Sequence, residues 1–579
     1  MSKFPVAGQS FVTIRRKNLL YIDKTEYIYK IIEDEGCYFL SRPRRFGKSL
    51  LLGAMEELFK GNRQLFKGLA IDSLGYDFQP YPVIKLSMAG LIGSTEGNLT
   101  DEALRETGAA NIIEFLRYRL RIKLSAAASD NKLDAPKLVQ DKGLNFSDIP
   151  PNSLLEIILQ TLHDKTDKKV VVLIDEYDSP IQSVISDSSL ADEIRKELHN
   201  FYSSLKTYSD DNKIHFLFVT GITKFAKASF FSVFNNYLDL TLDSHCAGIC
   251  GFTMPEFEEH LVPFLPDVLE SKKSEGSLAE SVALDEFKQM VLDQYDGYTW
   301  DGKTRILNPF SLINFLYFKK LNSYWYQSGT PTFLMDLVRE NPYEITRPDS
   351  FSLSTLSLSS LDIGHLSLVP LLFQTGYLTV DKVMSDTEYL LKEPNSEVSE
   401  AFNVGIMNAL TNKTNKNIDE LAKDINQALH NVDNMLLTKC FTTILDWFPY
   451  EIHVPLEYYY HSIIHCVLKV LKYKIESDVS QSGGRIDMVL EYSSKCVFVM
   501  EFKFESLVHK KTVANADGTE EVKTITVSPE VLLPKLLKDA KNQIEAKNYS
   551  RKYENEFETV HKVAVGIAGR TNIAVEIYK

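Results

Sequence analysis

The sequence predicts an α/β protein with a mixed α/β domain near each end and a mainly helical region between them. Its 579 residues exceed the ~100–200 residues of a typical domain, so three or four packing units are expected. The first ~250 residues alternate short apolar runs with amphipathic stretches, as in a sheet covered by helices. The last ~125 residues return to a mixed pattern of helices and strands.

The expected elements can be justified in chain order. Runs of β-branched and aromatic residues predict the strands, and apolar residues three or four apart predict the helices. In the first domain, strands are expected at Cys37–Ser41, Pro82–Leu86, Val170–Ile174 and His215–Val219, helices at Glu102–Leu124 and Ser153–His163, and a loop at Ser125–Pro136. In the last domain, helices are expected at Leu456–Tyr473 and Pro534–Asn548, strands at Ile486–Tyr492, Cys496–Phe504 and Lys562–Ala568, and a polar insertion at Leu507–Pro529.

Changes in this pattern suggest four segments. We expect an α/β core over 1–253, a helical lid over 254–400, a helical connector over 401–450 and a second α/β domain over 451–579. A winged-helix-like unit is one interpretation of the second half of the lid.

Composition excludes several classes of protein. Hydrophobic residues make up 44% of the chain and charged residues 25%, as in globular proteins. The N-terminus lacks a signal-peptide pattern, and no 18-residue apolar run occurs, so no membrane association is expected. Six scattered cysteines fit reduced thiols in a cytoplasmic protein. A net charge of −14 argues against a chain that coats nucleic acid nonspecifically, although a local basic groove remains compatible with it.

The first motif lies where the strand at Cys37–Ser41 turns into a helix. Residues 38–49 read Tyr-Phe-Leu-Ser-Arg-Pro-Arg-Arg-Phe-Gly-Lys-Ser, and the last three match the end of a phosphate-binding P-loop. Arg42 occupies the usual first glycine position, so a differently shaped loop is expected, with three arginines beside the phosphates. The residues expected to bind ATP here are Arg44, Arg45, Phe46, Gly47, Lys48 and Ser49, with Ser49 also holding Mg²⁺. A basic surface turn is the alternative reading of this motif taken alone.

A second motif supports the first. Residues 170–176 read Val-Val-Val-Leu-Ile-Asp-Glu, an aliphatic strand that ends in two carboxylates. Such a strand can deliver Asp175 to a Mg²⁺ ion and Glu176 to the attacking water as a catalytic base. The strand at His215–Val219 ends at Thr220, a candidate polar sensor for nucleotide. Both motifs in this order predict ATP binding.

A third motif lies near the C-terminus. Asp487 precedes Glu501-Phe502-Lys503, and Glu501 and Lys503 share one face because they lie two residues apart on a strand. Two carboxylates beside a lysine form a divalent-metal site suited to phosphodiester hydrolysis, with Asp487, Glu501 and Lys503 as catalytic residues. A solvated edge of an ordinary strand is the alternative, because this pattern also occurs by chance.

Further candidates surround this motif. Glu457, on the leading helix, is a candidate additional metal ligand. Gln543 and Lys547 lie four residues apart on a later helix and could contact substrate phosphate. Two other groups are expected to be structural, namely the pair His461 and His465 and the cluster His245, Cys246 and Cys250.

Taken together, these motifs resemble one family, the AAA-ATPase-like proteins with a C-terminal PD-(D/E)XK nuclease domain. The resemblance covers nearly the whole chain, and the Arg-Pro-Arg-Arg-Phe-Gly-Lys-Ser string at residues 42–49 is its most specific mark. Other marks begin at Tyr21 (Tyr-Ile-Asp-Lys-Thr), Leu173 (Leu-Ile-Asp-Glu-Tyr-Asp-Ser-Pro), Thr220 (Thr-Gly-Ile-Thr-Lys-Phe-Ala-Lys), Asn308 (Asn-Pro-Phe-Ser-Leu) and Tyr324 (Tyr-Trp-Tyr-Gln-Ser-Gly-Thr-Pro). The insertion at Leu507–Pro529 departs from the family and could cap the mouth of the nuclease site.

The resemblance implies a P-loop NTPase domain of AAA-like fold with a helical lid, followed by a restriction-endonuclease-like domain. We expect ATP and Mg²⁺ as cofactors, with Mn²⁺ as a substitute, and cleavage of nucleic acid, DNA rather than RNA, gated by the ATPase module. A homo-oligomer is one option, because ATPases of this type often place their sites at subunit contacts. Two alternatives stay open: a nucleotide-dependent switch or scaffold whose nuclease-like domain binds DNA or partners without cutting, and an ATPase with no nucleic-acid role.

Overall fold

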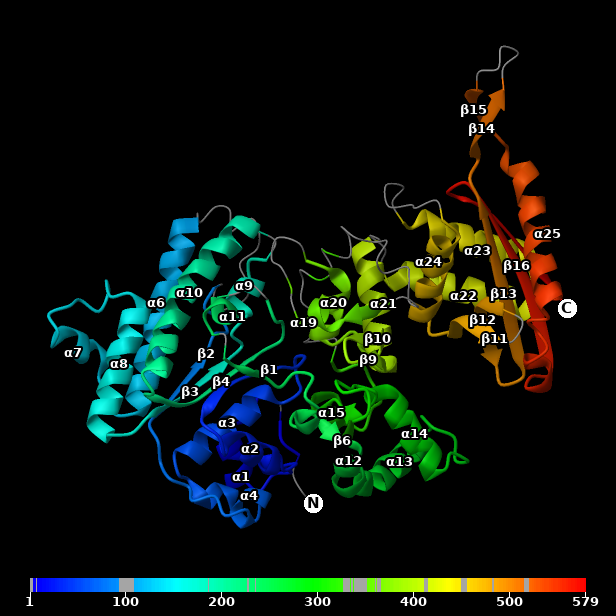
Figure 1. Cartoon of the computed structure of the whole chain (residues 1–579). Coiled ribbons are helices and arrows are strands. Elements are labelled where there is room, and N and C mark those ends of the chain that lie inside the picture. Colours follow the sequence, from blue (N-terminus) through cyan, green and yellow to red (C-terminus); the bar gives the residue numbers. More distant parts are fainter. Residues whose placement is uncertain are drawn as a thin grey trace. The chain divides into compact units, whose positions relative to one another are not determined.

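The computed structural model describes residues 4–6, 8–92, 109–185, 187–225, 229–234, 236–325, 334, 337, 351–359, 361, 366–410, 415–448, 456–481, 484–514 and 520–579. The chain divides into two compact units (Figure 1). The first consists of Met1–Phe333 and Ser352–Val398, and the second of Leu334–Phe351 and Ser399–Lys579. In the described part of the chain, no helix has both the length and the apolar character needed to span a bilayer.

A five-stranded parallel sheet forms the centre of the first unit. Its strands run in the order β2-β3-β4-β1-β5, and every neighbouring pair is parallel. They are β1 (Gly36–Ser41), β2 (Val83–Ser87), β3 (Val170–Asp175), β4 (Ile214–Gly221) and β5 (Leu238–Asp239). All six residues of β3 are buried, which explains its unbroken aliphatic sequence. Because the strands are parallel, the carboxyl ends of β1, β3 and β4 meet at one edge of the sheet.

Helices cover both faces of this sheet. One face carries α3 (Lys48–Phe59) and α1 (Phe11–Arg16), which pack against each other. The other carries α6 (Ala109–Asp130), α8 (Pro151–Thr166) and α10 (Ser188–Asp210), side by side (Figure 1).

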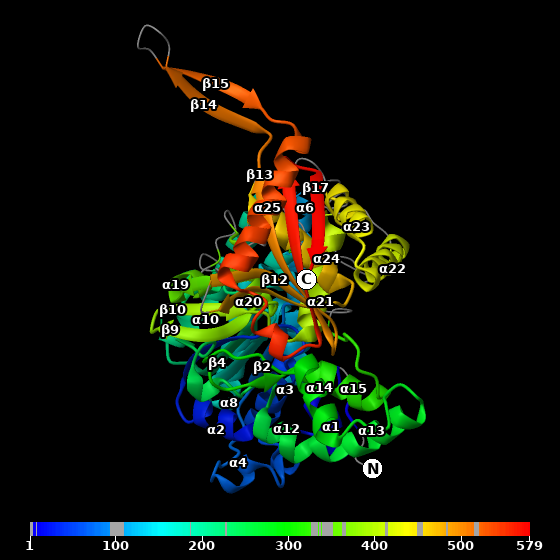
Figure 2. The ribbon, with the colours of Figure 1, turned by 90° about the vertical axis from the view of Figure 1, so that its right-hand side faces the viewer.

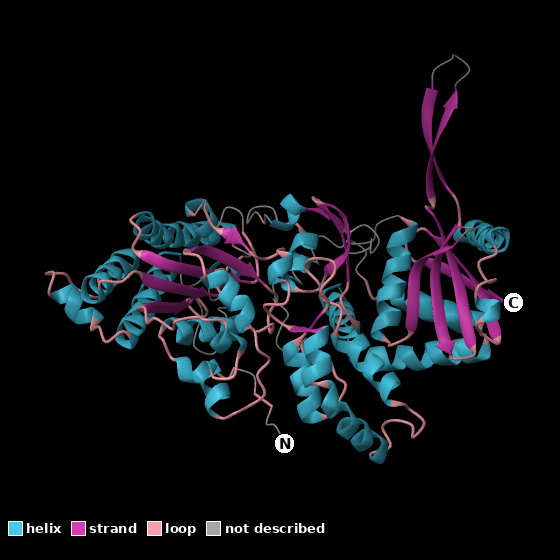
Figure 3. Ribbon diagram, turned by 60° about the horizontal axis from the view of Figure 1, so that its bottom comes forward, coloured by secondary structure: helices cyan, strands magenta, loops and turns pink. Residues whose placement is uncertain are grey.

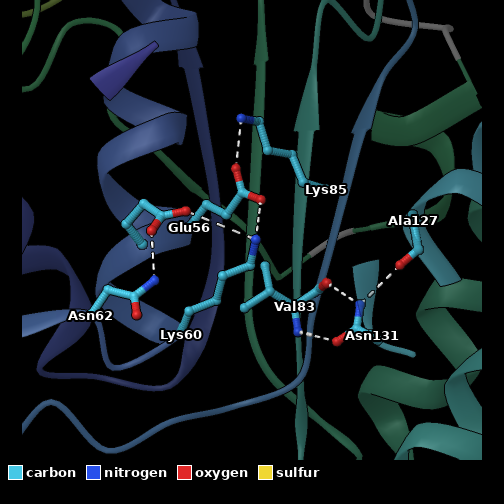
Figure 4. A network of polar contacts seen from close by, with 8 residues as sticks. Glu56, Lys60, Asn62, Val83, Lys85, Ala127 and Asn131 are labelled. Carbon is cyan, nitrogen blue, oxygen red and sulfur yellow. Dashed lines mark hydrogen bonds and ion pairs between the residues drawn. The ribbon is translucent and has the colours of Figure 1, made fainter. Parts of the chain in front are cut away.

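Polar contacts fasten β2 to the helices on each side of it (Figure 4). Lys85 of β2 forms an ion pair of 2.8 Å with Glu56 of α3, and Glu56 also pairs with Lys60 at 2.6 Å. Just after α6, the Asn131 amide donates to the Val83 carbonyl at 2.7 Å. The Lys85–Glu56 ion pair holds α3 against β2, and the first turn of α3 forms part of the loop described below.

The rest of the first unit is a helical layer and a small sheet. The helices are α12 (Met254–His260), α13 (Leu265–Ser274), α14 (Leu284–Tyr295) and α15 (Pro309–Phe318), which share one apolar core. Helix α20 (Leu368–Thr375) precedes β9 (Thr379–Ser385), which pairs with β10 (Glu388–Lys392), and β10 pairs with β8 (Ser352–Ser354). A capping box between Thr253 and Glu256 defines the start of α12.

The second unit contains a mixed sheet in the order β11-β12-β13-β16-β17 (Figure 2). The strands are β11 (Lys474–Gln481), β12 (Gly484–Ser493), β13 (Cys496–Glu505), β16 (Thr559–Ala568) and β17 (Asn572–Tyr578). Only the β13–β16 pair is parallel among these neighbours. The packed helices are α22 (Asn415–Asn431), α23 (Asn434–Asp446), α24 (Glu457–Val470) and α25 (Pro529–Lys547).

Helices α24 and α25 lie on opposite faces of β13. Val499 packs with Ile544 of α25, whereas Phe502 contacts His461 of α24 at 5.2 Å between ring centroids. Alternate residues of a strand point to opposite faces, so the odd-numbered Glu501 and Lys503 belong to the same side as Val499.

Several sequence expectations need correction. Ser125–Pro136 is not a loop: α6 continues to Asp130 and α7 (Ala135–Gln140) begins soon after it. The insertion after β13 is a hairpin of β14 (Val508–Ala514) and β15 (Glu520–Thr526), and α25 starts five residues earlier than expected. The sequence analysis missed the edge strands β11 and β17. Part of the helix expected at Glu102–Leu124 lies outside the described residues.

Candidate functional sites

The first candidate site is the loop between β1 and α3. Gly47 directly precedes α3 with φ of 97°, a left-handed conformation that glycine adopts at little cost. Arg45 also has a positive φ, 71°, so the loop makes its turn without the usual first glycine. Ser49 is exposed in the first turn of α3, which has no acidic residue and no side-chain cap. This helix N-terminus therefore offers free backbone N–H groups to an anion.

Lys48 lies at the centre of this loop and is buried. Its ammonium donates to the carbonyl oxygens of Arg42 at 2.7 Å and Pro43 at 2.9 Å. Burial lowers the pKa of Lys48, and the nearby Asp175 opposes that effect. The lysine is thus held by two neutral acceptors, which a phosphate group with its negative charge could replace.

The end of β3 brings two carboxylates to the same edge of the sheet. The Thr220 hydroxyl, at the end of β4, donates to Asp175 at 2.6 Å. Glu176 follows with φ of 53°, a strained conformation for a non-glycine residue. Burial and the neighbouring Asp175 raise the pKa of Glu176, which makes it a better proton acceptor than an exposed carboxylate.

Arg42 does not join the other two arginines beside the phosphate position, contrary to the sequence analysis. Its side chain is fully buried, and Nη1 donates to the carbonyls of Ser41 at 2.8 Å and Thr241 at 2.7 Å. The guanidinium lies 4.1 Å from the centroid of the Trp300 ring. Burial lowers the pKa of Arg42 to about 10, so it remains a cation at neutral pH. Its role in the fold is to join the loop to residues far along the chain.

Aromatic residues from the helical layer enclose the other side of the loop. The Phe46 ring contacts Tyr298 at 4.7 Å and Trp300 at 5.4 Å between centroids. The Trp325 indole donates to the Arg44 carbonyl at 3.4 Å. A Cβ atom on Gly376 would lie 2.6 Å from Pro43, so only glycine fits there. The sequence analysis did not find this aromatic cage, which we define as Tyr298, Trp300 and Trp325.

A cavity of about 1120 Å³ opens beside the loop. Lys48, Ser49 and Glu176 line one part of it, and the α15 residues Phe310 and Tyr317 line another. The Arg45 guanidinium lies 4.6 Å from the Phe310 ring centroid. A cationic end and an apolar, aromatic end fit the phosphates and the base of a nucleotide.

Asp178 is a further buried residue at this edge. One of its oxygens accepts from the Ile222 amide at 3.0 Å, and from the Thr223 amide at 2.7 Å and hydroxyl at 2.6 Å. It joins the segment after β3 to the segment after β4, which holds Asp175 and Thr220 in register. The sequence could have indicated Asp178, because it lies in Leu173–Pro180, one of the segments that resemble the family. Only Asp175 and Glu176 of that segment matched a known motif.

The second candidate site lies on β13 in the other unit. Glu501 is fully buried, and the Lys503 ammonium contacts its Oε1 at 2.9 Å. Asp487 on β12 accepts a hydrogen bond of 2.8 Å from the Phe502 amide, which holds its carboxylate beside the Glu501 strand. The three residues of the sequence motif are therefore brought together.

Glu457 approaches the same lysine from the first turn of α24. Its Oε1 lies 3.2 Å from the Lys503 ammonium, and its Oε2 accepts from the Phe504 amide at 3.1 Å. Across the described residues, no group of three Asp, Glu, His or Cys side chains is close enough to hold a metal ion. A metal here would take two carboxylates from the protein and other oxygen ligands from backbone, water or substrate.

The electrostatics of Glu501 fit a metal ligand. Burial and the negative charge of Asp487 raise the pKa of Glu501 to about 8. Its second oxygen, Oε2, is buried and makes no hydrogen bond with any part of the chain that the structure describes. An unsatisfied buried acceptor beside a second carboxylate is costly unless a proton or a cation occupies the position. Burial lowers the pKa of Lys503, but Glu501 and Glu457 raise it by more, so the lysine stays charged.

The other candidate residues lie around these sites without entering them. His465 is buried beside Ser477, and burial lowers its pKa to about 3, as expected for a packing residue. Gln543 donates to the Tyr549 hydroxyl at 3.4 Å, and Lys547 is exposed at the end of α25. His245 is exposed, whereas Cys246 and Cys250 are buried as free thiols.

The fold and the two sites define a protein that combines an ATPase-like α/β module with a nuclease-like α/β module. Comparison with known proteins agrees: residues 5–231 match the family model described as predicted AAA-ATPase, and residues 456–577 match that of the PD-(D/E)XK nuclease superfamily.

The chain belongs to this family of AAA-ATPase-like proteins with a C-terminal PD-(D/E)XK nuclease domain. It is similar to the "Uncharacterized protein in vnfD 5′region" of Azotobacter chroococcum mcd 1, with 30% identity over 517 residues. The match covers 87% of this chain and 90% of the relative. No solved structure matches the chain.

Proposed function

We propose that the protein binds and hydrolyses ATP and cuts DNA with a divalent metal, and that the nucleotide state controls the cutting. The observation that carries the nuclease assignment is the buried Glu501, which faces Asp487 and contacts Lys503 while one of its oxygens lacks a partner. An ordinary strand edge would expose these charges to water, so this burial argues against the alternative of a solvated edge.

In this proposal Asp487 and Glu501 hold Mg²⁺ or Mn²⁺, which when bound activates water and neutralises charge on the phosphate. Lys503, whose ammonium lies beside Glu457 and Glu501, orients the attacking water at the scissile phosphate. Glu457 holds the lysine in place and is a candidate outer ligand.

The nucleotide site uses the residues at the edge of the parallel sheet. Lys48 leaves the Arg42 and Pro43 carbonyls to bind the β- and γ-phosphates, while Ser49 and Asp175 hold Mg²⁺. Glu176 accepts a proton from the attacking water, and Thr220 orients Asp175. Arg44, Arg45, Phe46 and Gly47 complete the phosphate-binding loop. The proposed domains are the ATPase core at 1–253, the lid at 254–400, the connector at 401–450 and the nuclease domain at 451–579.

A second candidate function is a nucleotide-dependent switch whose nuclease-like domain binds DNA without cutting. One observation favours it: the described residues bring only two carboxylates, not three acidic or histidine side chains, to the proposed metal position. A site with few protein ligands can bind a metal ion weakly and show no catalytic activity.

The test compares cleavage of circular single-stranded and double-stranded DNA with Mg²⁺ or Mn²⁺, with and without ATP. We expect cutting by the wild type, its loss in Asp487→Ala, and an altered ATP dependence in Lys48→Ala. Lys495→Ala is the matched control, because Lys495 is exposed in the turn just before β13, at the end of the strand away from the site, where it pairs with Glu558. ATP binding should survive in Asp487→Ala. If no metal or nucleotide condition yields cutting by the wild type, the switch becomes the better description.

A further inference from the structure

Helix α6 carries two kinds of cationic side chain. Arg117 is neutralised, because its Nε donates to Glu197 of α10 at 3.0 Å. Arg119 and Lys123 form no ion pair or hydrogen bond with the described part of the chain, although both are only partly exposed. The Nε atom of Arg119 is buried without an acceptor among the described residues. Because buried donors are usually paired, Arg119 is a candidate for contact with an anion.

The spacing of these two cations makes them repel each other. Arg119 and Lys123 lie four residues apart, hence on the same side of α6, next to the buried Leu116 and Leu124. Like charges at this spacing destabilise a helix. Burial lowers the pKa of Lys123, Glu176 raises it, and Arg119 lowers it further. An anion beside the two cations would offset their repulsion.

The end of α6 fixes the height of these residues relative to the central sheet. Figure 3 shows the strands of this unit, in magenta on the left, beside helices in cyan. Asn131, just after α6, donates to the Val83 carbonyl at 2.7 Å and accepts from the Val83 amide at 3.3 Å (Figure 4). Lys123 lies eight residues, roughly 12 Å of helix, before Asn131. Ser87 lies four residues, roughly 13 Å of strand, after Val83. Since α6 packs along β2, Lys123 is level with Ser87, whose partner in β3 is Asp175.

Arg119 extends past the carboxyl ends of the strands. It lies one turn before Lys123, roughly 6 Å further from the end of α6, so its backbone lies beyond the end of β2. Side chains on a helix lean toward its N-terminus. The Arg119 guanidinium does so, because it lies 5.0 Å from the ring centroid of Phe115, one turn nearer that end. Glu176, directly after β3, is the acid whose charge acts on Lys123. The two cations therefore lie at the edge of the sheet that carries the proposed ATP site.

We propose that Arg119 is a catalytic residue of the ATPase site, which contacts the transferred phosphoryl group from within the same chain. This inference rests on the proposed function, because it takes ATP as the occupant of the loop between β1 and α3. In the reaction the oxygen of water bonds to the γ-phosphorus while the bond to the β–γ bridging oxygen breaks, and Glu176 takes the proton of the water. The Arg119 guanidinium stabilises the negative charge on the phosphoryl oxygens and on the leaving oxygen of ADP.

The origin of this cation decides whether one chain is enough for ATP hydrolysis. A catalytic arginine can come from the same chain or from a partner. Arg119 belongs to a helix that packs on the same sheet as Asp175 and Glu176. The rate of hydrolysis per chain should therefore not change when the protein is diluted.

The test measures ATP hydrolysis, affinity for a non-hydrolysable ATP analogue, and the melting temperature of the full chain. Arg119→Met should lower kcat roughly 10³-fold, as expected for a lost catalytic arginine, and leave the Kd of the analogue within about threefold of the wild type. Its melting temperature without nucleotide should not fall, because the repulsion with Lys123 is removed. Arg117→Met is the matched control, because Arg117 is an arginine of the same helix that pairs with Glu197, and it should keep the wild-type kcat within about twofold.

Two further measurements complete the test. Arg119→Lys keeps the charge but loses the planar fork of the guanidinium, so its kcat should lie between those of Arg119→Met and the wild type. This variant decides the question if Arg119→Met does not fold. An equimolar mixture of Arg119→Met and Lys48→Ala should stay as slow as the two variants measured apart, because neither chain holds both the lysine and the arginine.

A folded Arg119→Met or Arg119→Lys with the wild-type kcat would overturn the inference. Recovery of activity in the mixture would also overturn it, because the arginine would then act across a contact between two copies. Both results leave wild-type hydrolysis intact, so they are distinct from failure of the proposed function. A wild type that does not hydrolyse ATP would overturn the proposed hydrolysis itself, and this inference with it.

Discussion

At the residue scale, the key group of the nuclease-like site is Glu501. Its pKa rises from 4.5 to about 8 because it is buried next to Asp487. In the folded protein the carboxyl therefore keeps its proton at pH 7, unlike in the unfolded chain. Without metal, this residue favours the fold most below pH 4.5, and that contribution is lost as the pH rises through about 8.

A proton and a metal ion thus compete for the same carboxylate. We predict that the apparent affinity for Mn²⁺ rises about tenfold per pH unit between pH 6 and pH 8, since one proton is displaced, and levels off above pH 8. Calorimetric titration of the full chain at four pH values measures this. The control Lys495→Ala should show the same profile, and Glu501→Gln should lose the binding. An affinity that does not change from pH 6 to pH 8 would contradict the site.

Arg42 and Arg45 lie three residues apart in one loop and act differently. Arg42 is fully buried with carbonyl partners, whereas Arg45 is exposed and lines the cavity. We predict that Arg42→Met destabilises the first unit by about 2–4 kcal/mol, because it leaves buried carbonyls without donors. Arg45→Met should leave stability nearly unchanged and weaken ATP binding.

Thermal melts and nucleotide titrations of the two variants test this division. Each variant is the control for the other, since both replace an arginine by methionine within the same loop. Equal stability of Arg42→Met and the wild type would contradict the structural role of Arg42.

At the element scale, the sequence predicted those segments whose functional residues lie close together along the chain. Strands β1, β3 and β4 and the residues at their carboxyl ends could be found because a P-loop and an acidic strand end have fixed spacing. Glu501 and Lys503 were found for the same reason. The structure places these residues together as the motifs imply.

What the sequence could not supply depends on contacts between distant residues. The aromatic cage joins residue 46 to residues 298 and 300, and no local pattern encodes such a distance. Arg42 has the same sequence signal as its neighbours, and only the fold shows that it is buried. The edge strands β11 and β17 were not predicted, although Ile573, Val575 and Ile577 of β17 alternate with partly exposed residues, as in a half-buried strand. The hairpin of β14 and β15 was predicted only as a polar insertion, because most of its residues are polar.

At the scale of the whole molecule, the aromatic cage connects the loop between β1 and α3 to residues far along the chain. Lys48 is hydrogen-bonded to the Arg42 and Pro43 carbonyls, and Trp325 is hydrogen-bonded to the next residue, Arg44. If ATP binds as proposed and its phosphate draws Lys48 away, those carbonyls lose their donor, and we expect the loop to adjust. We expect the cage residues to respond first, because they contact the loop directly.

The three tryptophans of the chain make this change observable. Trp300 and Trp325 contact the loop, whereas Trp447 lies in the other unit. We predict that ATP changes the tryptophan emission of Trp447→Phe as it changes that of the wild type, because the two reporters at the loop remain. Lys48→Ala should show no such change at the same ATP concentration. A signal that disappears in Trp447→Phe would place the response outside the loop.

The close contact between Pro43 and Gly376 has a consequence for how the protein is made. About 330 residues separate the two positions, and Trp300 and Trp325 also follow the loop by more than 250 residues. At about 5–20 residues per second, a ribosome needs roughly 15–70 s to extend the chain from Pro43 to Gly376. During that time the loop between β1 and α3 is extended from the ribosome without the residues that enclose it. The emerging loop is therefore a site where a chaperone can act, and ATP binding is expected to mature only late in synthesis.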